Sequence, residues 1–249
     1  MNINNFRLVI VFAAFFVVMI MSGCGGSSIT KNDRKAAQIN VQLGLSYLKQ
    51  NNIELAKTKL RRALDDDPES SNVHWANALL HEKLGDIDQA ESHYQKAIDI
   101  NPRDSDAQNN FGAFLCRNGR AEAGLEAFNL AVKNSLYVYS ERAYTNAGIC
   151  LIRAGDQVEA ETYFRKSLNA NPRYAPGLYQ MALLLHEQKR YLGARAYRQR
   201  LVDALPAPSP KALLLCVKTE REMANYRVAR ECETQLKSKF PGSSEAAEI

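Results

Sequence analysis

The residue types that most often carry catalysis are sparse in this chain of 249 residues. It has four histidines and five cysteines, and none falls in an HExxH helix, a CxxC pair, a GxSxG turn or a glycine-rich phosphate loop. His186-Glu187 lacks the second histidine that a zinc-protease helix needs. We therefore expect no enzymatic activity and no small-molecule substrate.

Three of the histidines are near enough along the chain to converge on one metal ion. His74 and His81 are seven residues apart on one expected helix, and His93 lies on the next. No carboxylate or cysteine completes a ligand set with them in the spacing typical of zinc sites. We interpret them as structural histidines and expect no metal cofactor.

Cys24 is notable for the residues that precede it. Arg7 is followed by an uncharged apolar run, Leu8 to Met21, whose 14 residues are fewer than the roughly 20 that span a bilayer as a helix. The run ends in Met21-Ser22-Gly23-Cys24, which resembles the bacterial lipoprotein signal, where small residues precede a cysteine that is lipidated after cleavage. An ordinary cleaved secretory signal is the alternative.

The lipoprotein resemblance implies a signal peptide over 1–23 and a covalent lipid on Cys24 as the only non-protein group. Residues 24–36, rich in Gly, Ser, Thr and Asn, are expected to form a flexible tether. Gly25-Gly26 follows the cysteine, whereas lipoproteins retained at the inner membrane tend to have aspartate there. The resemblance therefore implies an outer-membrane protein that faces the periplasm.

The other four cysteines lie on apolar faces of expected helices, where a free thiol packs as a small hydrophobic group. An oxidising periplasm would also allow them to pair. We expect buried thiols, and if one pair is bridged we expect Cys216 with Cys232, because both belong to one repeat. The remaining two are Cys116 and Cys150.

The charge distribution favours an ordinary solvated surface over nucleic-acid binding. The formal net charge of +5 becomes +4 when Arg7 is removed with the signal, and positive and negative residues alternate along the expected helices without a basic block. We expect no nucleic-acid partner.

A repeat of about 34 residues fills nearly the whole chain after the tether. Small residues mark its copies at steps of 34, 34, 36, 34 and 35: Ala56, Ala90, Gly124, Ala160, Ala194 and Ala229. A proline follows twelve residues after each mark except the third: Pro68, Pro102, Pro172, Pro206 and Pro241. Each copy predicts two helices and a stop, and such a unit buries its apolar face only by stacking on its neighbours.

The pattern resembles the tetratricopeptide repeat, whose signature sets a large residue, Leu-Gly, Tyr, Ala, Phe, Ala and Pro at fixed intervals. The fold class implied is all-α, a right-handed superhelix of antiparallel helix pairs over 37–243, with a tail at 244–249. Arg198 and Glu233 occupy slots where an aromatic is usual, so the last two copies match least well. The six copies are 37–70, 71–104, 105–138, 141–174, 175–208 and 210–243.

In such a superhelix the first helix of each pair lines a concave groove. Reading the offsets from the core positions places apolar residues where a soluble protein usually has polar ones, and this predicts a hydrophobic partner-binding groove. Core packing between repeats is the alternative for the same residues. The predicted groove residues are Val41, Leu45, Leu48, Trp75, Leu79, Ile149, Ile152, Tyr179 and Leu183.

A second pattern on these helices is polar. Four basic residues recur in one slot of the first four copies, and two asparagines lie on the same helices, a combination that could clamp the carboxylate of a peptide terminus. Support of the helix dipole explains basic residues near helix ends equally simply. The candidate clamp consists of Lys49, Lys83, Arg117, Arg153, Asn110 and Asn146.

Together the lipoprotein signal, tether and six repeats resemble the PilF/PilW pilotin family of type IV pilus biogenesis. The stretches that carry the resemblance include Val41 to Leu48, Asn109 to Gly112, Lys211 to Leu215 and Phe240 to Ser243, whereas Val138-Tyr139 departs from the family's Pro-Glu. The resemblance implies a pilotin that binds the secretin subunit and promotes its outer-membrane localisation and oligomerisation. The alternative is a tetratricopeptide scaffold lipoprotein for another envelope assembly, such as cell-wall synthesis.

Overall fold

The computed structural model of the protein describes residues 29–249. Within that range the chain folds into thirteen α-helices and no strand, and twelve of the helices form six antiparallel pairs. The helices are α2 (Lys31–Lys49), α3 (Ile53–Asp66), α4 (Ser71–Leu84), α5 (Ile87–Ile100), α6 (Ser105–Arg117), α7 (Ala121–Lys133), α8 (Ser140–Ala154), α9 (Gln157–Ala170), α10 (Ala175–Glu187), α11 (Tyr191–Ala204), α12 (Pro210–Glu222), α13 (Tyr226–Lys239) and α14 (Ser244–Ala247).

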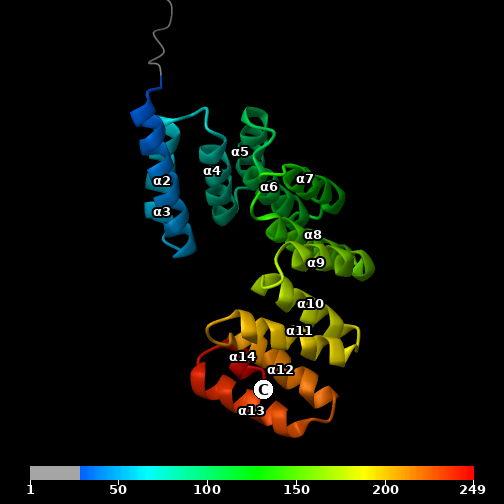
Figure 1. The fold of residues 1–249 in the computed structure, drawn as a ribbon. Helices are drawn as coiled ribbons and strands as arrows, with labels where there is room; N and C mark the ends of the chain where they lie inside the picture. Colours follow the sequence, from blue (N-terminus) through cyan, green and yellow to red (C-terminus); the bar gives the residue numbers. More distant parts are fainter. Residues whose placement is uncertain (1–28) are drawn as a thin grey trace, which may run out of the picture.

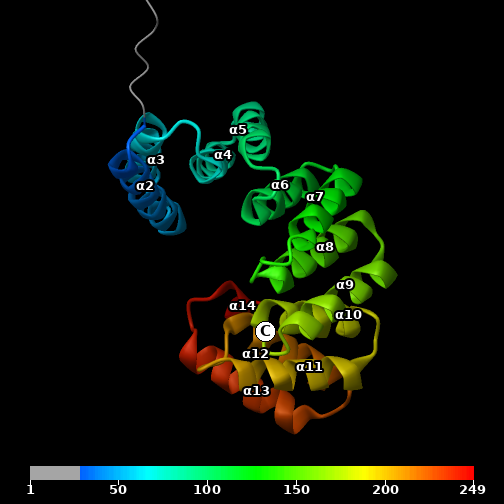
Figure 2. The same cartoon turned by 45° about the horizontal axis from the view of Figure 1, so that its top comes forward.

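The pairs stack into a curved solenoid that resembles the letter C (Figures 1 and 2). The first helix of each pair, here called the A helix (α2, α4, α6, α8, α10, α12), contacts the next A helix. The second, here called the B helix (α3, α5, α7, α9, α11, α13), contacts its own A helix and the A helix of the next pair but no other B helix. The A helices therefore form the inner surface of the curve, and the predicted tetratricopeptide superhelix is confirmed.

Small residues allow the two helices of a pair to approach closely. In the third pair, Gly112 of α6 faces Gly124 of α7, and a Cβ atom placed on Gly112 would lie 2.8 Å from the carbonyl oxygen of Gly124. That distance is shorter than any relaxed carbon–oxygen contact, and the obstacle is backbone that cannot rotate away. Glycine is therefore required at this position for the observed interhelical distance.

The turn inside each pair passes through the left-handed region once. Glycine supplies this conformation in three copies, at Gly85, Gly119 and Gly155 with φ of 77°, 77° and 87°. The other three copies use a residue with a side chain, of which Ala224 at φ 54° is the least suited. The remaining two are Asn51 and Lys189.

The first helix begins earlier than the sequence pattern predicts. Thr30 caps α2, because its side-chain oxygen accepts from the amide of Asp33 at 3.2 Å while the Asp33 carboxylate accepts from the Thr30 amide at 2.8 Å. This reciprocal capping satisfies two amides that would otherwise lack partners. The prediction of a flexible tether over 24–36 is therefore wrong from Lys31 onward.

The predicted tail is partly helical as well. Ser243 caps the short helix α14, and Ala246 and Ile249 pack against the core of the last pair beside Leu236. Burial of these apolar side chains explains why residues 244–249 fold back onto α12 and α13.

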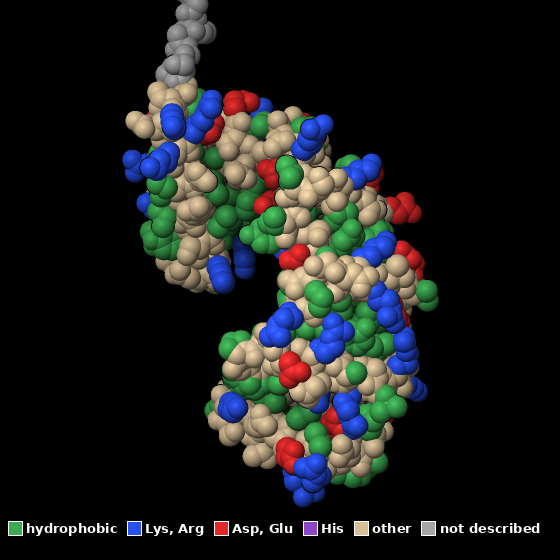
Figure 3. All heavy atoms as spheres, viewed as in Figure 1, with side chains coloured by type: hydrophobic (Ala, Val, Ile, Leu, Met, Phe, Trp, Pro, Cys, Tyr) green, Lys and Arg blue, Asp and Glu red, His purple; other side chains and the backbone are tan. Residues whose placement is uncertain are grey.

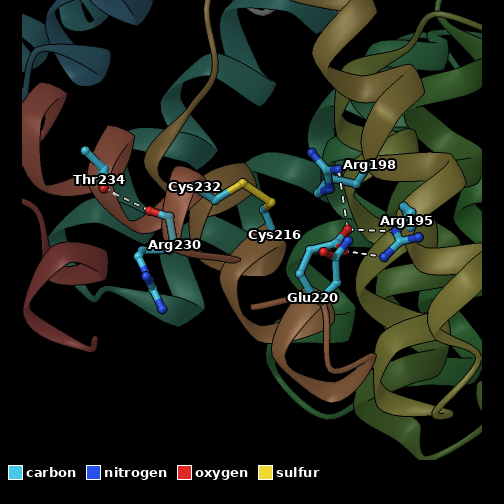
Figure 4. The surroundings of a disulfide bond; sticks show 8 residues. Arg195, Arg198, Cys216, Glu220, Arg230, Cys232 and Thr234 are labelled. Carbon is cyan, nitrogen blue, oxygen red and sulfur yellow. Dashed lines mark hydrogen bonds and ion pairs between the residues drawn. A yellow bond between two sulfur atoms is a disulfide. The ribbon is translucent and has the colours of Figure 1, made fainter. Parts of the chain in front are cut away.

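The expectation of buried free thiols is wrong for all four of these cysteines. Cys116 of α6 is bonded to Cys150 of α8, with Cα atoms 5.5 Å apart, so this disulfide crosses from the third pair to the fourth. Cys216 and Cys232 are bonded within the last pair, as expected for that pair if any bridge formed (Figure 4). The Cα atoms of the two pairs are 5.5 Å and 6.2 Å apart, within the range that a disulfide spans, a condition that buried thiols alone do not require.

The fifth and sixth pairs are joined by a buried ion cluster in place of aromatic packing. Glu220 of α12 is 1 % exposed and accepts from Arg195 Nε at 2.8 Å and from Asn225 Nδ2 at 2.9 Å. Arg198, in the slot where an aromatic is usual, directs its guanidinium at the same carboxylate (Figure 4). The departure of the fifth copy from the repeat signature at Arg198 therefore reflects a polar substitute for the usual aromatic contact.

Within residues 29–249 no helix combines the length and apolar character needed to cross a bilayer. The predicted signal peptide and Cys24 lie outside the described residues.

Candidate partner-binding groove

The inner surface of the solenoid is concave. Figure 3 shows the molecule hollowed between its N-terminal helices and its C-terminal pairs, with apolar, basic and acidic side chains at the margin of the hollow. The A helices that line it carry all of the residues proposed from the sequence for partner binding.

One slot of the A helices forms a regular apolar ladder along this surface. In each of the first five pairs the small residue that contacts the B helix is followed directly by an apolar residue that is partly buried. The five members are Leu45, Leu79, Ala113, Ile149 and Leu183. Each of these five residues keeps part of its side chain exposed to solvent, so the ladder is a surface that a partner could bury further.

Two of the predicted groove residues belong to the core instead. Val41 is 5 % exposed and Leu48 is 7 % exposed, and both pack with Val73, Ala76 and Leu80 of the neighbouring helix α4. The next A helix covers this side of α2, and the assignment of Val41 and Leu48 to a binding surface is therefore wrong. Leu45, between them, remains half-buried.

Trp75 is half-buried and packs at two interfaces between repeats. With Leu79 it packs against the core of the first and second pairs and against the core that includes Phe114 of the third. Its indole nitrogen donates to Asn72 Oδ1 at 2.9 Å, which fixes the ring orientation. Trp75 therefore contributes to packing as well as to the inner surface.

The C-terminal part of the candidate groove has an acidic margin. Ile152, Tyr179 and Ile149 are half-buried against the central core. Burial raises the pKa of the Tyr179 hydroxyl, and the negative charges of Glu245, Glu187 and Glu248 raise the pKa further. The short helix α14 thus brings carboxylates toward this end of the groove.

The predicted basic clamp does not form a single site. Arg117 is bound to Glu82 of α4, with Arg117 Nε 3.1 Å from the carboxylate. The same carboxylate accepts from the Tyr94 hydroxyl at 2.6 Å. Burial, followed by the nearby charge of Glu82, raises the pKa of Tyr94, so this hydroxyl stays protonated and continues to donate. Arg117 is therefore used to join the second and third pairs.

The two asparagines also differ from the prediction. Asn146 Nδ2 donates to the buried side chain of Asn109 at 3.0 Å, whereas Asn110 is half-buried beside it. Lys49, Lys83 and Arg153 are exposed in the last turns of α2, α4 and α8, where a positive charge stabilises the helix dipole. The helix-support interpretation therefore accounts for these three better than a peptide-carboxylate clamp does.

Sequence reasoning missed two features of this surface. Ala113 belongs to the apolar ladder but is too small to attract notice, although its position one residue after Gly112 identifies it. Glu82 occupies the slot that holds Leu48 and Ile152 in other copies, and its partner Arg117 is one repeat away. Aligning the copies slot by slot would have found both.

The histidines His74, His81 and His93 do come together between α4 and α5. Among residues 29–249 no group of three or more His, Cys, Asp or Glu side chains is arranged to hold a metal ion.

Comparison with known protein families and structures agrees with this architecture. Tetratricopeptide repeat family models match residues 41–105, 93–126 and 141–174. The chain is 30 % identical over 241 residues to the type IV pilus assembly protein PilF of Pseudomonas aeruginosa, which is 94 % of this chain and 95 % of PilF. An uncharacterized protein of Haemophilus influenzae is 35 % identical over 143 residues, which is 57 % of this chain and 80 % of that protein.

Two solved structures are similar over most of their length. The structure of Pseudomonas aeruginosa pilF has a TM-score of 0.72 and 31 % sequence identity to this chain. The similarity covers 88 % of this chain and 98 % of the pilF chain. The structure of PilW, described as a widely conserved type IV pilus biogenesis factor, has a TM-score of 0.74 and 27 % sequence identity. The similarity covers 85 % of this chain and 97 % of the PilW chain.

Proposed function

Because the chain belongs to the family of the type IV pilus assembly protein PilF, we propose that it is a lipid-anchored pilotin. In this proposal it binds the secretin subunit of the type IV pilus and promotes its localisation and oligomerisation at the outer membrane. The similarity to PilF and PilW supports a role in type IV pilus biogenesis. The observation that carries the binding step is the partly buried apolar ladder on the A helices.

The ladder suits a protein partner better than a small molecule. Its members recur once per repeat along five pairs, so a bound segment would have to be extended or helical and several repeats long. Completing the burial of one such leucine contributes about 1 kcal/mol, and several act together along the groove. The surface therefore binds by summed apolar contacts and requires no bond-making chemistry.

The early start of α2 sharpens the proposed tethering. Five residues lie between Cys24 and the cap Thr30, and the six Cα-to-Cα steps from one to the other span at most about 22 Å. A lipid on Cys24 would therefore hold the first helix pair close to the membrane. Such a short tether raises the local concentration of a bound subunit near the bilayer without any further contact.

Copurification from detergent-solubilised membranes tests this function. The tagged, lipidated protein is expected to recover the type IV pilus secretin, and a variant with Leu79→Glu is expected to recover less of it. Val158→Glu is the matched control, because Val158 is 80 % exposed on the B helix α9. Recovery of cell-wall enzymes in place of the secretin would support the scaffold alternative and contradict the pilotin proposal.

A further inference from the structure

Three imidazoles meet at the interface between the helices of the second pair. His74 and His81 come from α4 and His93 from α5. The Nδ1 atoms of His74 and His93 are 3.0 Å apart, and the rings of His81 and His93 stack with centroids 5.2 Å apart and an angle of 19°. The three rings therefore form one continuous contact across the interface.

Hydrogen bonding fixes where the protons lie in the neutral cluster. The Nε2 atom of His74 is 2.8 Å from the carbonyl oxygen of Pro68, which can only accept, so His74 carries its proton on Nε2. Its Nδ1 is then an acceptor, and His93 must donate from Nδ1 across the 3.0 Å contact. The neutral state is thus fully hydrogen-bonded between these two rings.

A first added proton has a suitable place at His81. Its Nδ1 is buried without a hydrogen-bond partner, and it lies 3.4 Å from the carboxylate of Asp86. Protonating His81 therefore forms an ion pair at the end of the cluster that is 23 % exposed.

A second added proton has no favourable place. On His93 it would stack a cation directly on protonated His81, and on His74 Nδ1 it would set two N–H donors face to face. Other charges on the packed helices are engaged elsewhere: Glu82 with Arg117, Glu91 with Arg120, Glu69 with Lys96, Asp104 with Ser71 and Asp66 with Asn40. Among residues 29–249, Asp86 is the one carboxylate within 4 Å of a ring nitrogen of the cluster.

We propose that His74, His81 and His93 form an acid-sensitive latch between α4 and α5, which holds the two helices together until the cluster takes up a second proton. Release of the latch would loosen α4, the helix that carries Trp75 and Leu79 on the inner surface. The proposal does not depend on the identity of the binding partner.

The direction of the pH effect follows from the depressed basicity of His93. Burial, followed by the charges of His74 and His81, lowers the pKa of His93 from 6.5 to about 4. In the opened state His93 regains its ordinary pKa, so between pH 6.5 and pH 4 the opened state binds more protons than the closed state does. The stabilising contribution of the latch is therefore fully present above pH 6.5. It is lost as the pH falls toward about 4, the pKa of His93 in the folded protein.

Hydrogen exchange and tryptophan emission of the intact protein test the latch. Trp75 is the only tryptophan of the chain and lies next to His74, so its emission reports on this pair. Between about pH 7.5 and about pH 4.5 we expect Trp75 emission to change and amide protection of residues 87–100, corrected for intrinsic rates, to fall at least about tenfold. His93→Gln keeps an N–H donor but cannot titrate, and its protection is expected to fall less than threefold.

Two further variants make the test decisive. His81→Phe keeps the stacked ring without its charge and should move the transition to lower pH, which gives an answer even if His93→Gln fails to fold. His186→Gln, remote on α10 with its partner Thr219, should titrate like the wild type. Constant wild-type protection over this range overturns the proposal, as does an unchanged transition in both the His93 and His81 variants.

Discussion

Arg198 of α11 lies with its guanidinium 3.8 Å from the buried carboxylate of Glu220 on α12, across the boundary between the fifth and sixth pairs. The Nε atom of Arg198 is buried without a hydrogen-bond partner, and burial lowers the pKa of its guanidinium. Arg195 completes the cluster from the same helix. The carboxylate of Glu220 therefore compensates the positive charges of the two arginines at this interface.

Removing that carboxylate should destabilise the C-terminal pairs strongly. Glu220→Ala leaves Arg198 buried without a counter-charge and is expected to lower the free energy of unfolding by about 3 kcal/mol. Denaturant unfolding followed by circular dichroism measures this. Glu248→Ala removes an exposed ion pair with Lys218 and should cost less than about 0.5 kcal/mol. Equal losses in the two variants would show that the buried cluster has no special role.

The disulfide between Cys116 and Cys150 should stabilise the junction of the third and fourth pairs. It closes a loop of 34 residues, for which chain entropy predicts about 4 kcal/mol of stabilisation. We expect the double variant Cys116→Ser/Cys150→Ser to unfold at markedly lower denaturant concentration. Thiol titration of the unfolded wild type with and without reductant provides the control, and four free thiols without reductant would contradict both bridges.

Gly112 should not tolerate even a methyl group. Its Cβ would lie 2.8 Å from the Gly124 carbonyl oxygen, so Gly112→Ala has to separate α6 from α7 and is expected to cost about 2 kcal/mol. Gly242→Ala serves as the control, because a Cβ there meets nothing within 4 Å. The prediction fails if the two alanine variants have the same thermal midpoint.

Ala224 offers a stabilising substitution. Its φ of 54° is the conformation that glycine supplies at the equivalent turn of three other pairs. Relief of the left-handed strain in Ala224→Gly exceeds the added unfolded-state entropy, and we expect a net gain of about 0.5 kcal/mol. A rise in the thermal midpoint would be the supporting result, and a fall would show that the turn is unstrained.

The fold was predictable because the repeat marks are steric requirements. Each close contact between an A helix and its B helix requires a small residue. Because these small residues recur at steps near 34, the sequence predicts a stacked solenoid of helix pairs. The end of the tether was not predictable from periodicity, since α2 extends beyond the repeat to a cap formed locally by Thr30 and Asp33.

The proposed binding surface was predictable only in part. Leu45, Val41 and Leu48 all lie on α2, and which of them stays uncovered depends on the angle at which α4 packs. The bridge from Cys116 to Cys150 was missed for a related reason, because reasoning within one repeat does not show that successive A helices are in contact.

The most direct test of the central claim is a binding titration of the secretin subunit against the purified protein and two glutamate variants. If the apolar ladder is the binding surface, Leu45→Glu combined with Leu79→Glu should weaken binding at least tenfold, while folded Val158→Glu binds like the wild type. Unchanged affinity in a folded ladder variant, or no binding by the wild type, would contradict the claim.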